Sequence, residues 1–261
     1  MSGVIIDKKI ADGVAILTLD NPPLNLVTRD MTQALDSGLS DLAADTEVRV
    51  LVVRGAGERA FCAGSDISEF PTYIEAGNVV EKKLRYENEI YSKLDDFPKP
   101  TIAAVDGLAY GGGLEMAACC DLIVVEEDAR LCLPEIHLGV FPGSGGSIRI
   151  TRRIGEGRAK EIIFFGNPID PATALAWGLV NRVVAPGTAV ASAVDWARDM
   201  ATRPGLALQA CKKAVDLAFD MSEDEAIKRT LDISTEIFAT DDCKEGVRAF
   251  FAKDTPHFRH R

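Results

Sequence analysis

The stretch Ile102–Glu115 reads IAAVDGLAYGGGLE, and our interpretation of the fold starts from the change of local structure within it. The run Thr101–Val105 is short and apolar, which predicts a buried strand, and Asp106-Gly107 predicts a turn. The glycines Gly111–Gly113 follow, and the residues after them have the pattern of a helix. The stretch therefore predicts a strand, a glycine turn and a helix in that order, with Glu115 near the start of the helix.

A second glycine turn, Ala63–Ser65, and a second glutamate, Glu135, complete the candidate site. Because glycine has no side chain, the backbone can approach a ligand closely and point its N–H groups at an oxygen that gains negative charge. Carboxylates placed nearby can move protons. The combination predicts an acid/base enzyme with two carboxylates and a backbone oxyanion site. Taken singly, Glu115 is more typical of a favourable helix-dipole partner than of a catalytic group, and Glu135 is also compatible with a surface turn.

Apolar periodicity along the rest of the chain predicts alternating strands and helices, followed by a helical C-terminal part. An opening hairpin is expected from Val4–Ile10 and Val14–Asp20. The other expected elements up to Val184 are helices over 28–44 and 79–94, strands over 48–54, 121–126 and 130–133, and a loop over 55–65. Beyond Val184 only helices are expected, over 189–202, 206–220, 223–238 and 242–253.

Three helix starts have the spacing of a capping box, in which an N-cap side chain and an acidic residue three positions later bond each other's backbone. The pairs are Asp66 with Glu69, Ser222 with Glu225, and Asp242 with Glu245.

Composition excludes several classes of protein. The chain has 261 residues and a net charge of −11, which argues against nucleic-acid binding because that depends on a dense basic surface. Its apolar runs stay below the roughly 20 residues of a membrane helix. Two candidate basic patches for an anionic ligand are present, each with a solvated face as the alternative: Lys82, Lys83 and Arg85, and the C-terminal residues Lys253, Arg259 and Arg261.

The six cysteines and the N-terminal sequence bear on metal binding and location. The cysteines show no C-x-x-C pair and no histidine at zinc-ligand spacing, so no metal site is expected. The chain begins MSGV without a signal or transit pattern, so we expect a cytoplasmic protein with reduced thiols.

Common catalytic and cofactor motifs are not matched. Gly55–Gly57 is followed by Ala60 where a dinucleotide fingerprint needs its third glycine, and Gly143–Gly146 has no lysine after it, as a phosphate loop requires. Ser144 has Pro142 where a nucleophile elbow has glycine. The three histidines leave a Ser-His-Asp triad open, but no pattern supports one.

Several motifs in fixed order resemble the enoyl-CoA hydratase/isomerase, or crotonase, superfamily. The resemblance covers nearly the whole chain and rests on AFCAGSDI at Ala60–Ile67, the stretch Ile102–Glu115, PEI at Pro134–Ile136, GVFPGSGG at Gly139–Gly146 and EGVRAFF at Glu245–Phe251. It implies an α/β fold in which ββα units form a spiral over residues 1–188. A helical region over 189–261 would then build homotrimers, usually paired into hexamers.

The resemblance also implies a substrate and roles for the site residues. The family binds acyl-CoA thioesters, and the backbone N–H groups of Ser65 and Gly112 would form the oxyanion hole for the thioester carbonyl. Glu115 would orient water and accept its proton, while Glu135 would deliver a proton to the α carbon. CoA contacts are expected from Leu24, Leu26, Ala63, Ser65, Asp66 and Ile67, and from Phe250 and Lys253 toward the CoA of a neighbouring subunit.

The expected activity is reversible hydration of trans-2-enoyl-CoA to 3-hydroxyacyl-CoA, as in fatty acid β-oxidation, without a cofactor other than the CoA of the substrate. Two alternatives stay open: an enoyl-CoA isomerase or specialised dehydratase of the same superfamily, and an inactive acyl-CoA-binding subunit. Ser65 stands where the family frequently has alanine, Cys132 where it has glycine and Phe141 where it has a smaller aliphatic residue, which leaves the acyl preference open.

Overall fold

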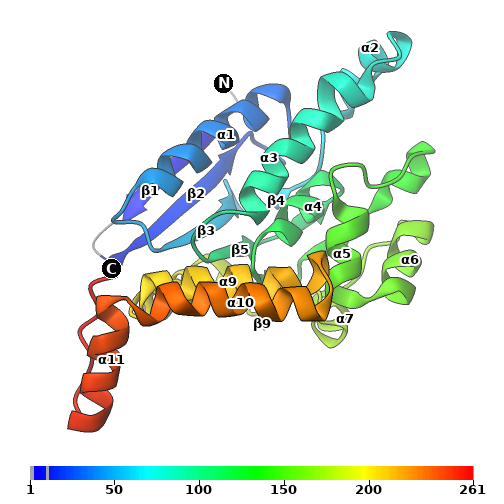
Figure 1. The fold of residues 1–261 in the computed structure, drawn as a ribbon. Helices are drawn as coiled ribbons and strands as arrows, with labels where there is room; N and C mark the ends of the chain where they lie inside the picture. Colours follow the sequence, from blue (N-terminus) through cyan, green and yellow to red (C-terminus); the bar gives the residue numbers. More distant parts are fainter. Residues whose placement is uncertain (1–2, 10–11, 261) are drawn as a thin grey trace.

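The computed structural model describes residues 3–9, as backbone, and residues 12–260. A six-stranded sheet runs through the molecule in the order β1-β2-β3-β5-β7-β9 (Figure 1). Only β1 and β2 are antiparallel, and each later neighbour is parallel to the one before. The strands are β1 (Gly3–Lys9), β2 (Val14–Asp20), β3 (Val50–Gly55), β5 (Thr101–Val105), β7 (Leu122–Glu126) and β9 (Arg182–Val184).

A smaller parallel sheet, β4-β6-β8, lies next to the large one. Its strands are β4 (Ala60–Cys62), β6 (Leu108–Tyr110) and β8 (Arg130–Cys132), and each directly follows a strand of the large sheet. Helical segments come after each pair, so the chain repeats a ββα unit. The predicted spiral of ββα units is confirmed. The strand at Ala60–Cys62 falls in a segment expected to be a loop, because three residues are too short for a periodic pattern.

The large sheet is apolar on both faces, as parallel sheets usually are. Leu51 and Val53 face one way and pack with the apolar sides of α1 (Arg29–Ala44) and α3 (Arg85–Asp95). Val50 and Val52 face the other way and pack on a row of alanines in α8 (Ala189–Ala201). The remaining helical segments before α8 are η2 (Ile67–Glu69), α2 (Phe70–Glu75), η3 (Val80–Leu84), α4 (Gly112–Cys119), η4 (Pro134–Leu138), α5 (Gly146–Ile154), α6 (Glu156–Phe165) and α7 (Pro171–Trp177).

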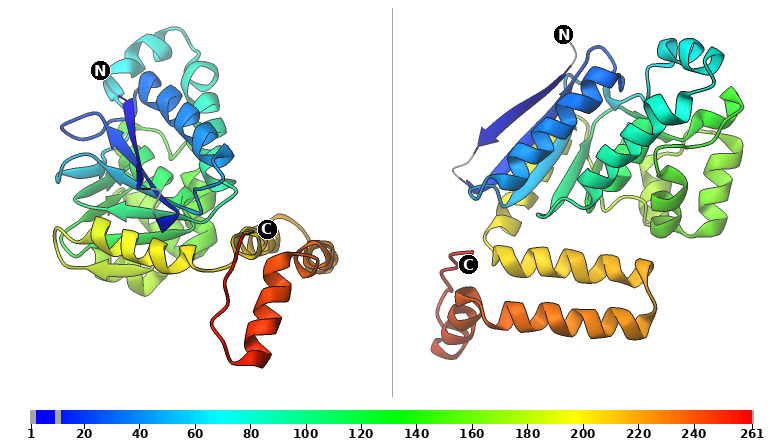
Figure 2. Two further views of the ribbon diagram at one scale, coloured as in Figure 1. Left: turned by 90° about the vertical axis from the view of Figure 1, so that its left-hand side faces the viewer. Right: turned by 45° about the horizontal axis from the view of Figure 1, so that its top comes forward.

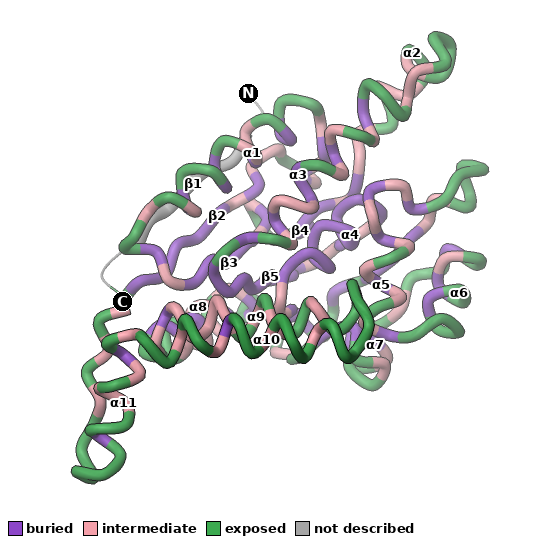
Figure 3. Tube along the Cα trace, in the orientation of Figure 1, coloured by how far each residue is buried: buried purple, intermediate pink, exposed green. Residues whose placement is uncertain are grey.

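The last three helices form an arm that extends from the sheets. These are α9 (Gly205–Asp220), α10 (Glu223–Phe238) and α11 (Asp241–Ala252), which lie beside the body in the left view of Figure 2 and below it in the right view. Figure 3 shows that the arm is largely exposed or half-buried, whereas β2, β3, β5 and α4 are mostly buried. The expected helical region from residue 189 thus includes α8, which covers the sheet, and the boundary between the two predicted domains stays a prediction.

One of the three expected capping boxes is present. Ser222 and Glu225 form it at the start of α10. Asp66 instead accepts from the Ser68 amide at the start of a short 3₁₀ turn, while Glu69 pairs with Lys83, so the expected box at Asp66 is wrong.

The third expected box, Asp242 with Glu245, is also wrong. Thr240 caps α11, and the carboxylate of Asp242 accepts from the backbone of Arg259 and His260. A tertiary contact has overridden the local pattern.

The segment expected as one helix over 79–94 starts with a π-helical stretch, η3, before α3 continues it. Among the described residues no helix combines the length and the apolar composition needed to cross a bilayer.

Candidate active site

The glycine turn between β6 and α4 is held against the end of β8. The Gly111 amide donates to the Cys132 carbonyl at 2.8 Å, and Gly111 has φ 50° and ψ −125°. This conformation is rarely open to a residue with a side chain. The chain therefore turns sharply into α4, whose first residue is Gly112 and whose first turn contains Glu115.

The two predicted oxyanion donors come together from separate loops. An ideal Cβ built on Gly112 would lie 3.7 Å from the Ser65 nitrogen, and one built on Gly64 would lie 3.5 Å from the Gly112 nitrogen. Within residues 12–260, neither amide donates a hydrogen bond to a protein acceptor. Both N–H groups are thus close together and available to a ligand oxygen.

The Glu115 carboxylate is held by backbone amides. It is 2% exposed, and its Oε1 accepts from the amides of Ser144 and Gly146, both at 2.8 Å. Gly146 leaves room for this approach, since an ideal Cβ there would lie 2.5 Å from Cγ of Glu115. The start of α5 therefore fixes the position of Glu115.

The pKa of Glu115 is raised to about 7. Burial is the main cause, and the negative charges of Glu135 and Glu87 also raise the pKa, while the amide hydrogen bonds from Gly146 and Ser144 lower it. A carboxyl group with this pKa exchanges protons readily near neutral pH.

Glu135 lies in the first turn of η4, directly after β8, and is partly buried. Its Oε1 would be 3.0 Å from an ideal Cβ on Gly111, so it faces the glycine turn. Its Oε2 is buried and has no hydrogen-bond partner among the described residues. Burial raises the pKa of Glu135 as well. A buried oxygen without a partner is costly in a folded protein, and it is placed to bond a ligand or water.

The predicted CoA-contact residues near Ser65 lie along one edge of the site. The Ala63 amide donates to the Leu24 carbonyl at 3.0 Å, and the Asp66 amide donates to the Val27 carbonyl at 3.1 Å. Leu26 is partly buried next to them, and Ile67 is 58% exposed.

Phe250 and Lys253 are not brought to this site within the chain. They lie at the end of α11, and all three views of the ribbon separate that helix from α4 (Figures 1 and 2). Phe250 is 78% exposed.

Sequence reasoning missed a group of polar residues behind the oxyanion turn. Glu87 on α3 is buried and pairs with Lys83 at 2.9 Å, and it accepts from the hydroxyl of Ser144 at 2.9 Å. Tyr91, also on α3, donates to the Gly112 carbonyl at 3.0 Å. A possible signal was the spacing of Lys83, Glu87 and Tyr91 at four-residue intervals, which puts them on one helix face.

The candidate basic patch of Lys82, Lys83 and Arg85 is not a shared exposed surface of free positive charge. Lys83 is 6% exposed and paired with Glu87, while Arg85 is bonded to Glu81 on the surface.

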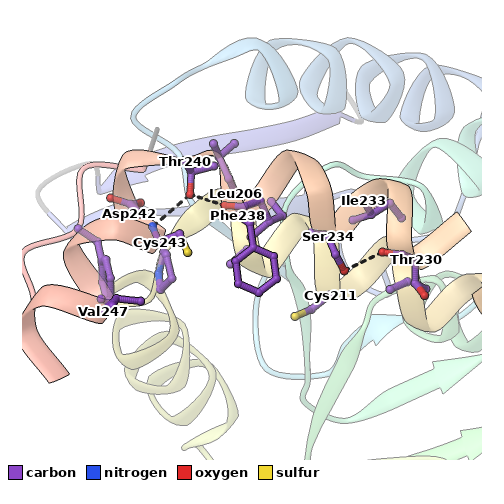
Figure 4. Close-up of a pocket in the computed structure, with 17 residues that line it drawn as sticks. Leu206, Cys211, Thr230, Ile233, Ser234, Phe238, Thr240, Asp242, Cys243 and Val247 are labelled. Atoms are coloured by element: carbon purple, nitrogen blue, oxygen red, sulfur yellow. Dashed lines mark hydrogen bonds between the residues drawn. The ribbon is translucent and has the colours of Figure 1, made fainter. Parts of the chain in front are cut away.

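A large cavity lies elsewhere, between α9, α10 and α11. Its volume is about 490 Å³, and its walls are mostly apolar side chains from the three helices (Figure 4). Neither predicted catalytic glutamate lines it. Among the described residues no cluster of three or more histidine, cysteine, aspartate or glutamate side chains has the arrangement of a metal site.

Comparison with known proteins identifies the family. The model of the enoyl-CoA hydratase/isomerase family matches residues 9–261. The chain is 34% identical to a short-chain-enoyl-CoA hydratase of Clostridium acetobutylicum, covering 97% of this chain and 96% of that protein. It is 37% identical to a probable enoyl-CoA hydratase of Rhizobium meliloti, with 95% of each chain covered.

The solved structure of an enoyl-CoA hydratase from Bacillus anthracis superposes with a TM-score of 0.93 at 30% identity, covering 99% of this chain and 100% of that one. Fold, motif order and sequence similarity agree over the full length. The chain belongs to the enoyl-CoA hydratase/isomerase family.

Proposed function

We propose that this protein is an enzyme that reversibly hydrates trans-2-enoyl-CoA thioesters to 3-hydroxyacyl-CoA. The observation that carries the proposal is the meeting of two carboxyl groups of raised pKa, Glu115 and Glu135, with two unpaired amides from distant loops. Relatives named as enoyl-CoA hydratases at 34–37% identity support the same reaction.

The amides of Ser65 and Gly112 donate to the carbonyl oxygen of the thioester. When water adds to the double bond, electron density moves through the conjugated system onto this oxygen and an enolate forms. Two fixed donors, together with the N-terminal end of α4, stabilise that charge. Each donor in such a site typically contributes about 3 kcal/mol to the transition state.

Glu115 and Glu135 carry out the proton transfers. Glu115 in its charged form accepts a proton from the attacking water, and Glu135 in its protonated form gives a proton to the α carbon. The pKa of Glu115, raised to about 7, keeps both forms of this group accessible near neutral pH, and burial raises the pKa of Glu135 in the direction that favours its protonated form. Each residue takes the opposite role in dehydration. Activity should therefore fall at low pH, as Glu115 becomes protonated, and at high pH, as Glu135 loses its proton.

The substrate supplies the only cofactor-like group, its CoA, and no metal or redox cofactor takes part in the proposed reaction. The segments around Leu24–Leu26 and Ala63–Ile67 bind the CoA, since they border the oxyanion turn. We assign the enzyme to fatty acid metabolism in the cytoplasm. All six cysteines are free thiols, which supports a reducing compartment.

The proposed assembly is a homotrimer, or a hexamer made of two trimers. The exposed apolar side chains of the arm support it, because faces of this kind usually become covered. They include Ile227, Leu231, Phe238, Val247, Phe250 and Phe251. In the assembly Phe250 and Lys253 reach the CoA of a neighbouring subunit.

Incubation with crotonyl-CoA tests the proposal. Hydration removes the conjugated double bond, so the ultraviolet absorbance of the enoyl thioester should decrease. Unchanged absorbance across a panel of 2-enoyl-CoA thioesters of different chain length would contradict the proposal. A 3-enoyl-CoA substrate distinguishes the isomerase, because isomerisation creates the absorbance instead of removing it.

A further inference from the structure

The π-helical segment η3 (Val80–Leu84) brings a lysine to the back of the candidate site. Its hydrogen bonding runs from the Arg85 amide to the Val80 carbonyl, five residues back. Single π-helical turns are rare and are frequent at functional sites. Lys83 lies in this turn and is 6% exposed. Burial of an ammonium group is unfavourable unless ion pairs or hydrogen bonds replace its contacts with water.

Lys83 finds these partners on three different segments. Its Nζ lies 2.9 Å from Oε1 of Glu87 and 3.3 Å from Oε2 of Glu69, and it donates to the Val27 carbonyl at 3.5 Å. Burial lowers the pKa of Lys83, but the charges of Glu87 and Glu69 outweigh burial and the net shift is upward, so the ammonium stays charged. Val27 forms an isolated parallel bridge with Ser65, and Lys83 therefore supports the oxyanion turn from behind.

Glu87 bonds both halves of the site, one with each carboxylate oxygen. Oε1 accepts from the Ser65 hydroxyl at 3.4 Å, and Oε2 accepts from the Ser144 hydroxyl at 2.9 Å. Ser144 in turn donates its amide to Oε1 of Glu115 at 2.8 Å. One carboxylate thus links the turn that carries an oxyanion donor with the turn that holds a catalytic glutamate.

We infer that Glu87 is a positioning residue for catalysis, which aligns the Ser65 amide with the Glu115 carboxylate through the hydroxyls of Ser65 and Ser144 while Lys83 balances its charge. The inference rests on the proposed function. It also gives a role to the Ser65 hydroxyl, which has no part in the backbone oxyanion hole. A positioning role needs a fixed, fully bonded side chain, and Glu87 is 2% exposed with partners on both oxygens.

The alternative is a buried ion pair that only stabilises the fold. Such pairs are often replaceable without harm to structure, and breaking one changes stability. The two roles therefore differ in what they change: a structural pair changes the free energy of unfolding, whereas a positioning residue also changes kcat at saturating substrate.

The test compares Glu87→Gln and Ser144→Ala with the wild type in crotonyl-CoA hydration. Each variant should lower kcat by about 10-fold, the effect of losing one charge-assisted hydrogen bond, with KM changed less than about twofold. Ser144→Ala retains the backbone amide that holds Glu115, so its loss of kcat reports the hydroxyl bond to Glu87 alone. If Glu87→Gln does not fold, Ser144→Ala still decides.

The double variant Glu87→Gln/Ser144→Ala should be no slower than the slower single variant, because both substitutions break the same bond. The control is Asp36→Asn, which removes a different ion pair of α3, the one between Lys93 of α3 and Asp36 of α1. It should leave kcat unchanged.

The pH profile gives a second measurement. The charged groups that face Glu115 are Glu135 from η4 and Glu87 from α3, and both raise the pKa of Glu115, after burial as the main cause. Burial keeps the nearby Tyr91 and Cys119 uncharged by raising the pKa of each well above its ordinary value. Glu87→Gln should therefore move the acid limb of the kcat profile to lower pH.

Three outcomes separate the claims. A wild type that hydrates no enoyl-CoA overturns the proposed function. With an active wild type, a kcat within twofold of wild type in both single variants overturns the role of Glu87. The role of Glu87 is also overturned if a folded Glu87→Gln protein has the same acid limb of the kcat profile as the wild type.

Discussion

The body of this molecule buries several charged side chains, whereas the arm exposes large apolar ones. In the body, charged side chains such as Glu115 and Glu87 are each 2% exposed and bonded to backbone amides, serines or a lysine. In the arm, Phe238 and Phe250 are 75% and 78% exposed. The difference indicates that the single chain completes most of a polar site by itself, whereas the arm exposes the apolar side chains that the proposed assembly would cover. Substitutions in the two parts should therefore have different effects, on catalysis in the body and on assembly in the arm.

The largest effect is expected from the glutamates of the body. Glu115→Gln and Glu135→Gln should each reduce kcat for crotonyl-CoA hydration by about 10²–10⁴-fold, because each removes one proton-transfer group. Molecular mass and circular dichroism should match the wild type. The exposed Glu127 allows a control, Glu127→Gln, that should retain full activity. Normal turnover in either site variant would remove the acid/base pair from the mechanism.

Removal of one oxyanion donor should have the next largest effect. Gly112→Pro deletes the N–H of Gly112 at the first residue of α4, where helices accept proline. The expected loss of kcat is about 10²–10³-fold. Gly112→Ala adds a Cβ and keeps the N–H, so it controls for the added bulk near Tyr91. Equal activity of the two variants would show that the Gly112 amide does not bind the substrate oxygen.

The stability of the body should depend on pH through Glu115. Its pKa rises from an ordinary 4.5 to about 7 on folding, so between these values the folded state binds more protons than the unfolded state. The free energy of unfolding therefore falls as pH rises through this range, by up to about 3 kcal/mol. Glu115→Gln should abolish this decrease in the free energy of unfolding, because glutamine does not titrate.

Urea unfolding at pH 4.5 and pH 8 measures the effect. Relative to wild type, Glu115→Gln should be more stable at pH 8 than at pH 4.5 by up to about 3 kcal/mol. The exposed-site variant Glu127→Gln serves again as the control. If the difference in stability between Glu115→Gln and wild type is the same at both pH values, burial does not favour the uncharged form of Glu115.

The smallest effect is expected in the arm. Phe238→Asp should weaken the assembly by about 2 kcal/mol, the value of burying one large apolar side chain, and lower the mass measured by light scattering at low protein concentration. Helix content should stay the same. Glu236→Gln changes an exposed polar residue of the same helix and should leave the mass unchanged. An unaltered mass for Phe238→Asp would show that this face of α10 does not lie in the interface between subunits.

The sequence predicted best those features that depend on neighbouring residues. The strand at Thr101–Val105, the turn at Gly111–Gly113 and the helix after it follow from residue types in one short stretch. The three-residue strand β6, between them, was not predicted. The capping box at Ser222 is likewise local and is present. The same signature failed at Asp242, because residues 17 and 18 positions away compete for its carboxylate.

Glu87 could not be predicted from local pattern. Its partners Ser65 and Ser144 lie 22 and 57 residues away, and its charge suggests a solvent-facing helix position. Only the fold shows that a lysine inside a π-helical turn neutralises it. The meeting of the Ser65 and Gly112 amides was anticipated from the resemblance to a family, since no spacing rule connects two loops so far apart.

The π-helical turn at residues 80–84 contains one residue more than an α-helical turn, so the length of this segment can be compared among relatives. Deletion of one residue within 80–84 would close this turn into an ordinary α-helical one. That change rotates what precedes it by about 100° relative to α3, since an α-helix has 3.6 residues per turn. The number of residues aligned with 80–84 in a relative therefore indicates whether it retains the lysine support or must stabilise the site by other means.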